Sequence, residues 1–74
     1  MTKYYIVATN EVNNIEWIIN DQLEESENLI EFLMQDGYLF DTKEEAQNII
    51  NLYHHVYDGE CFDLVNLRIF DIEV

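Results

Sequence analysis

The stretch TKEEAQNIINLYHHVYDG, residues 42–59, carries the start, repeat and stop signals of one amphipathic helix. Thr42 and Glu45 have the spacing of a capping box, in which each side chain bonds the other residue's free backbone N–H. Gly59 follows as a stop signal. The apolar residues that recur at helical spacing, and that we expect to be buried, are Ala46, Ile49, Ile50, Tyr53, Val56 and Tyr57. We therefore predict a main helix over about 43–57.

Two strands are predicted before this helix. The segment KYYIVAT (3–9) is rich in β-branched and aromatic residues. In IEWIIN (15–20), Ile15, Trp17 and Ile19 alternate with Glu16, Ile18 and Asn20, so the two sets lie on opposite faces of a strand. Between them lies the turn cluster NEVNN (10–14). Such a short connection indicates an antiparallel β-hairpin over 3–20.

A further strand is predicted near the C-terminal end, over 62–73. The apolar residues of this stretch change parity along it, from Val65, Leu67 and Ile69 to Phe70, Ile72 and Val74. A change of parity within one strand indicates either a β-bulge or a strand that is covered on both faces.

The segment between the hairpin and the main helix predicts a shorter, acidic helix over about 26–35. Ser26 can cap this helix and Gly37 can close it. Its expected buried side consists of Leu29, Ile30, Leu33 and Met34. A strand over 29–34 is the alternative, because Phe32 also requires burial. YLF (38–40) is predicted as a short strand that leads into the main helix.

These elements predict an α+β fold, in which a small antiparallel sheet of three to four strands packs against the main helix in a single domain over 1–74. The single Cys61 excludes an internal disulfide and fits a reducing cytoplasm. No segment resembles a signal peptide, and no apolar run approaches the roughly 20 residues that span a bilayer. We therefore expect a cytoplasmic protein without membrane contact.

The net charge of −13 is unusually large for 74 residues, since small domains commonly carry a net charge of about 2 to 8 in magnitude. Residues 21–45 alone hold nine acids and one cation, Lys43, for a net charge of −8. Direct binding to nucleic acid is therefore disfavoured, whereas a Lys/Arg-rich partner would relieve the repulsion.

If the acidic helix forms, Glu24, Glu27 and Glu31 lie on one of its faces, with successive carboxylates about 5 to 6 Å apart. Such a row of anions imitates a nucleic-acid strand. Acids in the following loop and at the start of the main helix extend it. The predicted partner-binding residues are Asp21, Glu24, Glu25, Glu27, Glu31, Asp36, Asp41, Glu44 and Glu45.

No motif for metal, cofactor or catalytic chemistry is recognised. Adjacent residues on a helix point about 100° apart, so His54 and His55 cannot both easily ligate one metal ion. The sequence around Gly37 and Gly59 lacks the alternating acids of a calcium-binding loop. A glycine-rich phosphate loop and a nucleophile elbow are also missing. We therefore expect a protein without cofactor, metal site or enzymatic activity.

The segments WIIND (17–21) and DGYLFDTKEEAQNII (36–50) resemble a pattern in small phage and prophage proteins, where a Trp-containing strand precedes a Gly-x-x-Phe-x-Thr-x-Glu-Glu-Ala helix start. In size and charge the chain is also similar to DNA-mimic anti-restriction and anti-CRISPR inhibitors. This resemblance implies a phage-type inhibitor that occupies the nucleic-acid-binding surface of a basic host protein.

The alternative hypothesis is a small homo-oligomeric assembly module or regulator with a solvated acidic face. High aromatic content in a short chain motivates it, and a homodimer could form through a hairpin edge or an aromatic face. Composition leaves open whether the protein is a monomer or a homodimer.

Overall fold

The computed structural model describes residues 1–57 and 64–74. At its centre is the predicted hairpin, formed by the antiparallel strands β1 (Thr2–Asn10) and β2 (Glu16–Ile19). The Asn10 side chain shapes the turn, because its Oδ1 accepts hydrogen bonds from the backbone N–H groups of Val12, at 2.9 Å, and Asn13, at 3.2 Å. The hairpin expected over 3–20 is confirmed.

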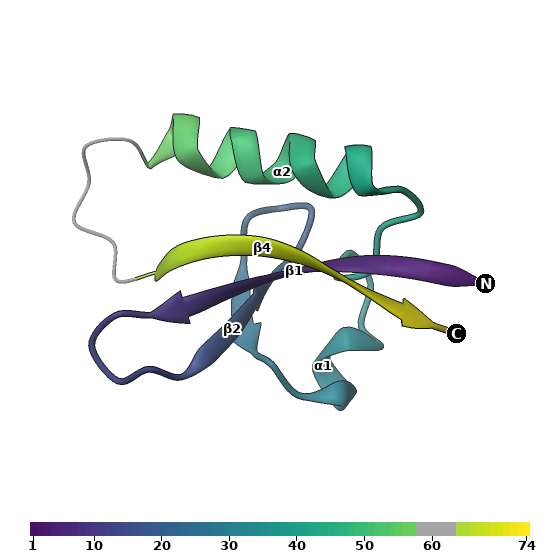
Figure 1. Ribbon diagram of the computed structural model, residues 1–74, viewed down its shortest axis with the longest axis horizontal. Coiled ribbons are helices and arrows are strands. Elements are labelled where there is room, and N and C mark those ends of the chain that lie inside the picture. The colour runs from purple at the N-terminus through teal and green to yellow at the C-terminus, as the bar shows by residue number, and fades with distance from the viewer. Residues whose placement is uncertain (58–63) are drawn as a thin grey trace.

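Two further strands complete an antiparallel sheet in the order β3-β2-β1-β4 (Figure 1). The short strand β3 (Glu25–Glu27) pairs with β2, and the long strand β4 (Leu64–Glu73) pairs with β1. The predicted C-terminal strand is confirmed from Leu64 onward. Its expected first residues, 62 and 63, together with Gly59 and Cys61, lie outside the described residues.

Both faces of the sheet are covered, as Figure 1 shows with α2 (Lys43–Val56) on one side and α1 (Ile30–Leu33) on the other. On the α2 side, the buried cluster consists of Ile6, Ala8, Ile19, Phe40, Ala46, Ile50 and Tyr53. On the α1 side, it consists of Val7, Ile18, Leu33 and Tyr38. Ile18 and Ile19 are therefore both fully buried, although they point in opposite directions.

The strand β4 contains the bulge that its change of parity predicts. Pairing with β1 shifts register where Val7 lies opposite Arg68 and Thr9 lies opposite Val65. Asn66, inside this irregularity, has a φ of 57°. The bulge brings Leu67 onto the α2 side. The expected inward positions Val65 and Phe70 are instead 38% and 42% exposed, because they lie on an edge strand.

The main helix is confirmed, since α2 covers Lys43–Val56 and buries Ala46, Ile50 and Tyr53. The expected burial of Val56 is wrong, because this residue in the last turn of the helix is 48% exposed. Half of the predicted capping box forms, because Thr42 Oγ1 accepts the Glu45 N–H at 3.1 Å. The Glu45 carboxylate instead accepts the N–H of Asp41, at 3.3 Å.

The acidic helix predicted over 26–35 is found only as the four residues of α1, and residues 25–27 are strand β3. Leu29 adopts an extended conformation, with φ −119° and ψ 144°, so the helix cannot begin before Ile30. Of the expected buried side, Leu33 is buried, whereas Leu29, Ile30 and Met34 are 43%, 62% and 56% exposed. Within 38–40, Phe40 forms a bridge with Tyr4.

Candidate partner-binding surface

The acidic segment begins with a turn that the buried side chain of Asn20 organises. Its Oδ1 accepts the N–H groups of Gln22 and Glu24, each at 2.9 Å, and its Nδ2 donates to the Glu24 carboxylate at 3.1 Å. Leu23, inside the turn, has a φ of 63° and packs against the α2-side core. The backbone that carries Asp21 and Glu24 is thus held by part-buried hydrogen bonds to a buried side chain.

The next acids lie on β3, where strand alternation decides their direction. Glu25 pairs with Ile19 and Glu27 with Trp17, and residues directly opposite in a sheet point to the same face. Both carboxylates therefore lie on the α2 side. Ser26 points the other way, and its hydroxyl lies 2.6 Å from the Tyr38 hydroxyl.

Glu25 reaches the helix itself, because the Tyr53 hydroxyl donates to Glu25 Oε1 at 3.5 Å. Tyr53 is only 3% exposed. Its burial, and then the negative charge of Glu25, raise the pKa of Tyr53 to about 12. This contact ties the edge strand β3 to the last turn of α2.

Asp21 and Glu45 lie far apart in sequence but line the same surface pocket, which has a volume of about 350 Å³. Asp21 can lie there because residue 37 is glycine: a Cβ on Gly37 would stand 2.6 Å from Asp21 Oδ1, and its φ is +91°. The backbone N–H of Asp21 also bonds the Gly37 carbonyl at 3.0 Å. The remaining lining residues are Leu39, Phe40, Asn48 and Ile49.

These contacts define one surface, the β3–α2 face, which consists of Asp21, Glu25, Glu27 and Glu45. Sequence reasoning named all four acids as partner-binding residues, but it placed Glu27 in a helical row with Glu24 and Glu31, which is wrong because Glu27 lies on the strand β3. It missed Leu39, Phe40, Asn48 and Ile49 as their neighbours. No local pattern signals that pocket, because only the tertiary fold brings the lining residues together.

The other predicted residues are distributed differently. Glu24 lies in the Asn20 turn, and the exposed Asp41 and Glu44 flank the start of α2. Glu31 belongs to α1, on the opposite side of the sheet, and the exposed Asp36 follows that helix. The expected common face of Glu24, Glu27 and Glu31 therefore does not exist, since these residues lie in three different elements: the Asn20 turn, β3 and α1.

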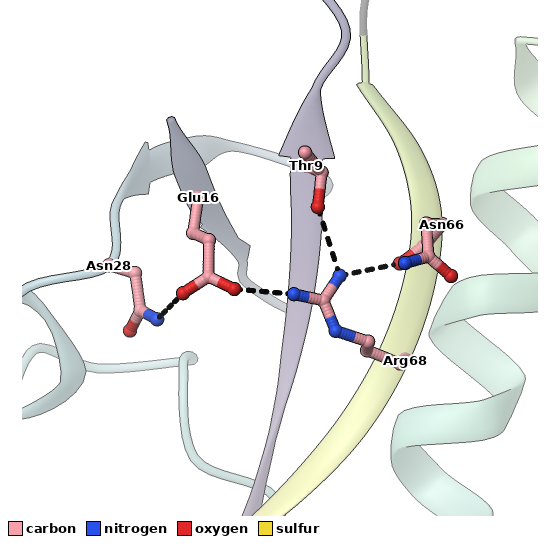
Figure 2. Close-up of polar contacts among 5 residues, drawn as sticks. All are labelled: Thr9, Glu16, Asn28, Asn66 and Arg68. Carbon is pink, nitrogen blue, oxygen red and sulfur yellow. Dashed lines mark hydrogen bonds and ion pairs between the residues drawn. The ribbon is translucent and has the colours of Figure 1, made fainter. Parts of the chain in front are cut away.

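The three basic side chains do little to balance this charge. Arg68 bonds Glu16 at 2.5 Å and Thr9 at 3.1 Å, away from the β3–α2 face (Figure 2). Lys3 pairs with Asp41, and Nζ of Lys43 lies 6.0 Å from the Tyr4 ring centroid. Of the nine predicted acids, all of them among the described residues, Asp41 is the one with an ion pair.

Within residues 1–57 and 64–74, no group of three or more His, Cys, Asp or Glu side chains could hold a metal ion. Among the same residues, no helix is long and apolar enough to cross a membrane.

No protein-family model, no curated protein and no solved structure matches this chain. A functional hypothesis therefore depends on the residues and geometry described above.

Proposed function

We propose that the protein is a non-enzymatic acidic binding protein that occupies the basic, nucleic-acid-binding surface of a host protein. It would act as a stoichiometric inhibitor of the phage type, by charge mimicry of a nucleic acid in the host cytoplasm. The β3–α2 face would make the central contacts, with Glu24, Asp41 and Glu44 beside it.

The uncompensated charge is the observation that carries this proposal. The four acids of the β3–α2 face, Asp21, Glu25, Glu27 and Glu45, have no ion pair within the described part of the chain. Such a surface attracts a groove lined with Lys and Arg, and the association is fast and sensitive to salt.

The rigid presentation of the carboxylates adds support. Asn20 holds the turn before β3, and the contact of Glu25 with Tyr53 ties β3 to α2. Because these groups are held before binding, little conformational entropy is lost when a partner engages them. That distinguishes the face from a flexible acidic tail.

The pocket supplies a suitable environment for a basic side chain. It combines the carboxylates of Asp21 and Glu45 with the apolar side chains of Leu39 and Ile49. A guanidinium group pairs with carboxylates while its alkyl chain packs on apolar surface. An arginine of the partner fits this combination of groups.

The proposal is tested by capturing partners from a host lysate on the immobilised protein at low and at high salt. A variant with Asp21→Lys and Glu27→Lys reverses two charges on the β3–α2 face. The matched control carries Glu11→Lys and Glu31→Lys, which change the net charge equally at exposed positions away from that face. Both variants are checked for a folded state by circular dichroism.

The wild type and the control are expected to capture the same basic, nucleic-acid-binding protein at low salt and to release it at high salt. The Asp21→Lys, Glu27→Lys variant should lose it. Equal capture by both variants, or capture that salt does not weaken, would contradict charge mimicry by this face.

A further inference from the structure

The strand β4 forms one edge of the sheet. It pairs with β1 on one side, and no other strand of the described residues pairs with it. The ten residues of β4 make it the longest strand, whereas the opposite edge strand, β3, has three residues. A long edge with unpaired backbone groups is a template for another strand.

The direction of the backbone groups along β4 follows from one hydrogen-bonded pair at its end. Met1 and Val74 exchange both of their N–H to C=O bonds, at 2.9 and 2.7 Å. In an antiparallel ladder such pairs alternate with non-bonded pairs. Ile72, Phe70 and Arg68 therefore bond β1, and the backbone groups of Ile69, Asp71 and Glu73 point outward.

The opposite edge of β1 confirms this alternation. Tyr4, which lies opposite Asp71, directs its backbone groups away from β4 and bonds Phe40, at 2.9 and 2.7 Å. The Asp71 backbone groups must then also point away from β1. Beyond its bulge, the outer side of β4 thus offers a regular series of donors and acceptors that no described residue pairs.

The side chains of β4 suit burial better than exposure. Phe70, at 42% exposed, contacts Tyr5 and lies 5.5 Å from the Arg68 guanidinium carbon. Val65 is 38% exposed on the same strand. A neighbouring strand would cover these apolar groups.

The charge distribution identifies the neighbour as a second copy. β3 and the Phe40 bridge lie on the β2 side of β1, so the acids of residues 21–27 lie toward the opposite edge of the sheet from β4. The last eleven residues carry Arg68, Asp71 and Glu73, a net charge of only −1. Two copies joined at β4 keep these acids at opposite ends of the joined sheet, which lowers the repulsion between them.

We propose that two copies of this chain pair antiparallel through the outer edges of β4, so that the two four-stranded sheets become one continuous sheet. This self-association goes beyond the proposed inhibitor function and uses β4, the edge strand opposite to β3, which carries Glu25 and Glu27 of the β3–α2 face. Both activities can therefore coexist in one molecule.

Symmetry restricts the register of this pairing. The two-fold axis runs perpendicular to the sheet, so a residue faces one of equal parity in the second copy. If the two-fold axis passed beside Asp71, the Asp71 carboxylates of the two copies would lie opposite each other, which is unfavourable. A centre at Ile69 instead places Arg68 opposite Phe70 of the second copy, where a cation–π contact can form.

Molar mass and amide exchange test the proposal together. Sedimentation equilibrium should give a dimer that dissociates on dilution and that added salt strengthens, because screening reduces like-charge repulsion. At high protein concentration, the amides of Ile69, Asp71 and Glu73 should exchange at least ten-fold more slowly than after dilution. The amides of Phe70 and Ile72 should change little, since they bond β1 in either state.

Asp71→Pro removes one outward N–H and leaves the β1 ladder intact, since the bonded pairs flank this position. It should weaken dimerisation at least ten-fold. Asp71→Asn is the matched control, because it removes the same charge but keeps the N–H, and it should dimerise at least as well as the wild type.

The wild-type protein alone can overturn the proposal. It would do so if its mass were monomeric at all concentrations and if amide exchange at Ile69 and Asp71 did not change. Protection of these amides by a different protein alone would assign the edge to that protein instead. Dimers that Asp71→Pro leaves intact would also contradict a β4 interface. Because salt strengthens this contact and weakens binding to a basic partner, failure of one proposal is distinguishable from failure of the other.

Discussion

The side-chain amide of Asn20 holds the turn on which the acidic segment begins. It is 6% exposed, and its oxygen accepts two backbone N–H groups. Asn10 makes a similar pair of bonds in the exposed hairpin turn. The two asparagines therefore differ mainly in burial, and water can replace the bonds of Asn10 more easily.

Asn20→Ala should lower the free energy of unfolding by about 1–3 kcal/mol, because the part-buried N–H groups of Gln22 and Glu24 lose their acceptor. Asn10→Ala should lower it by less than about 1 kcal/mol, since water reaches the freed groups. Urea denaturation of both variants measures the difference. Equal losses would mean that burial of Asn20 contributes nothing to the turn.

Tyr53 predicts how stability depends on alkaline pH. Burial, and then Glu25, raise its pKa from 10.0 to about 12 in the folded protein. The folded state holds this proton more tightly than the unfolded state, so the contribution is complete below pH 10 and is lost as pH rises toward 12.

Between pH 10 and 12 the wild type should therefore lose on the order of 2 to 3 kcal/mol more stability than Tyr53→Phe, which has no hydroxyl to titrate. Urea denaturation of both proteins at several pH values measures this difference. Parallel stability curves would show that Tyr53 titrates at its ordinary pKa.

At the level of elements, α2 could be predicted to within a residue at its end because its signals are local. The cap at Thr42 and the apolar repeat through Tyr53 lie within the helix itself. The conformation of residues 25–27 could not be predicted in this way, because it depends on pairing with the edge of β2, which is distant in the local sequence pattern. Glutamate favours helices in isolation, yet Glu25 and Glu27 form a strand because they pair with Ile19 and Trp17.

The bulge in β4 was signalled by a change of parity, whereas its position at Asn66 depends on pairing with β1. Asn66 has a φ of 57°, in the left-handed region that β-branched residues avoid. Asn66→Val should cost about 1–2 kcal/mol, and Asn66→Gly should stay within about 0.5 kcal/mol of the wild type. Thermal unfolding of both variants measures these differences. If Asn66→Val were as stable as the wild type, the strand would not require a left-handed conformation at this position.

At the scale of the whole molecule, the identity of the acids is evident from composition, but their arrangement is not. Asp21 and Glu45 line the same pocket only because Gly37 leaves space for the Asp21 side chain and because α2 folds back over the sheet. Glu31 was expected beside Glu27 and lies on the other side of the sheet. Helical periodicity predicts neighbours within one element and cannot predict neighbours across elements.

The unbalanced charge predicts that salt stabilises the free protein. Raising the salt concentration from about 0.01 to 0.15 M shortens the screening length from about 30 to 8 Å and weakens repulsion among the carboxylates. The melting temperature should rise by about 4–8 °C for each kcal/mol gained. Calorimetry at a fixed low protein concentration checks this. A flat or falling melting temperature would show that the carboxylates are already balanced within the fold.

Displacement of a labelled nucleic acid from the purified, captured partner tests the central claim most directly. The wild type and the Glu11→Lys, Glu31→Lys control should displace it at one-to-one stoichiometry, whereas Asp21→Lys, Glu27→Lys should need at least ten-fold more protein. Equal displacement by all three proteins, or none by the wild type, would contradict the assignment of the β3–α2 face as a mimic of nucleic acid.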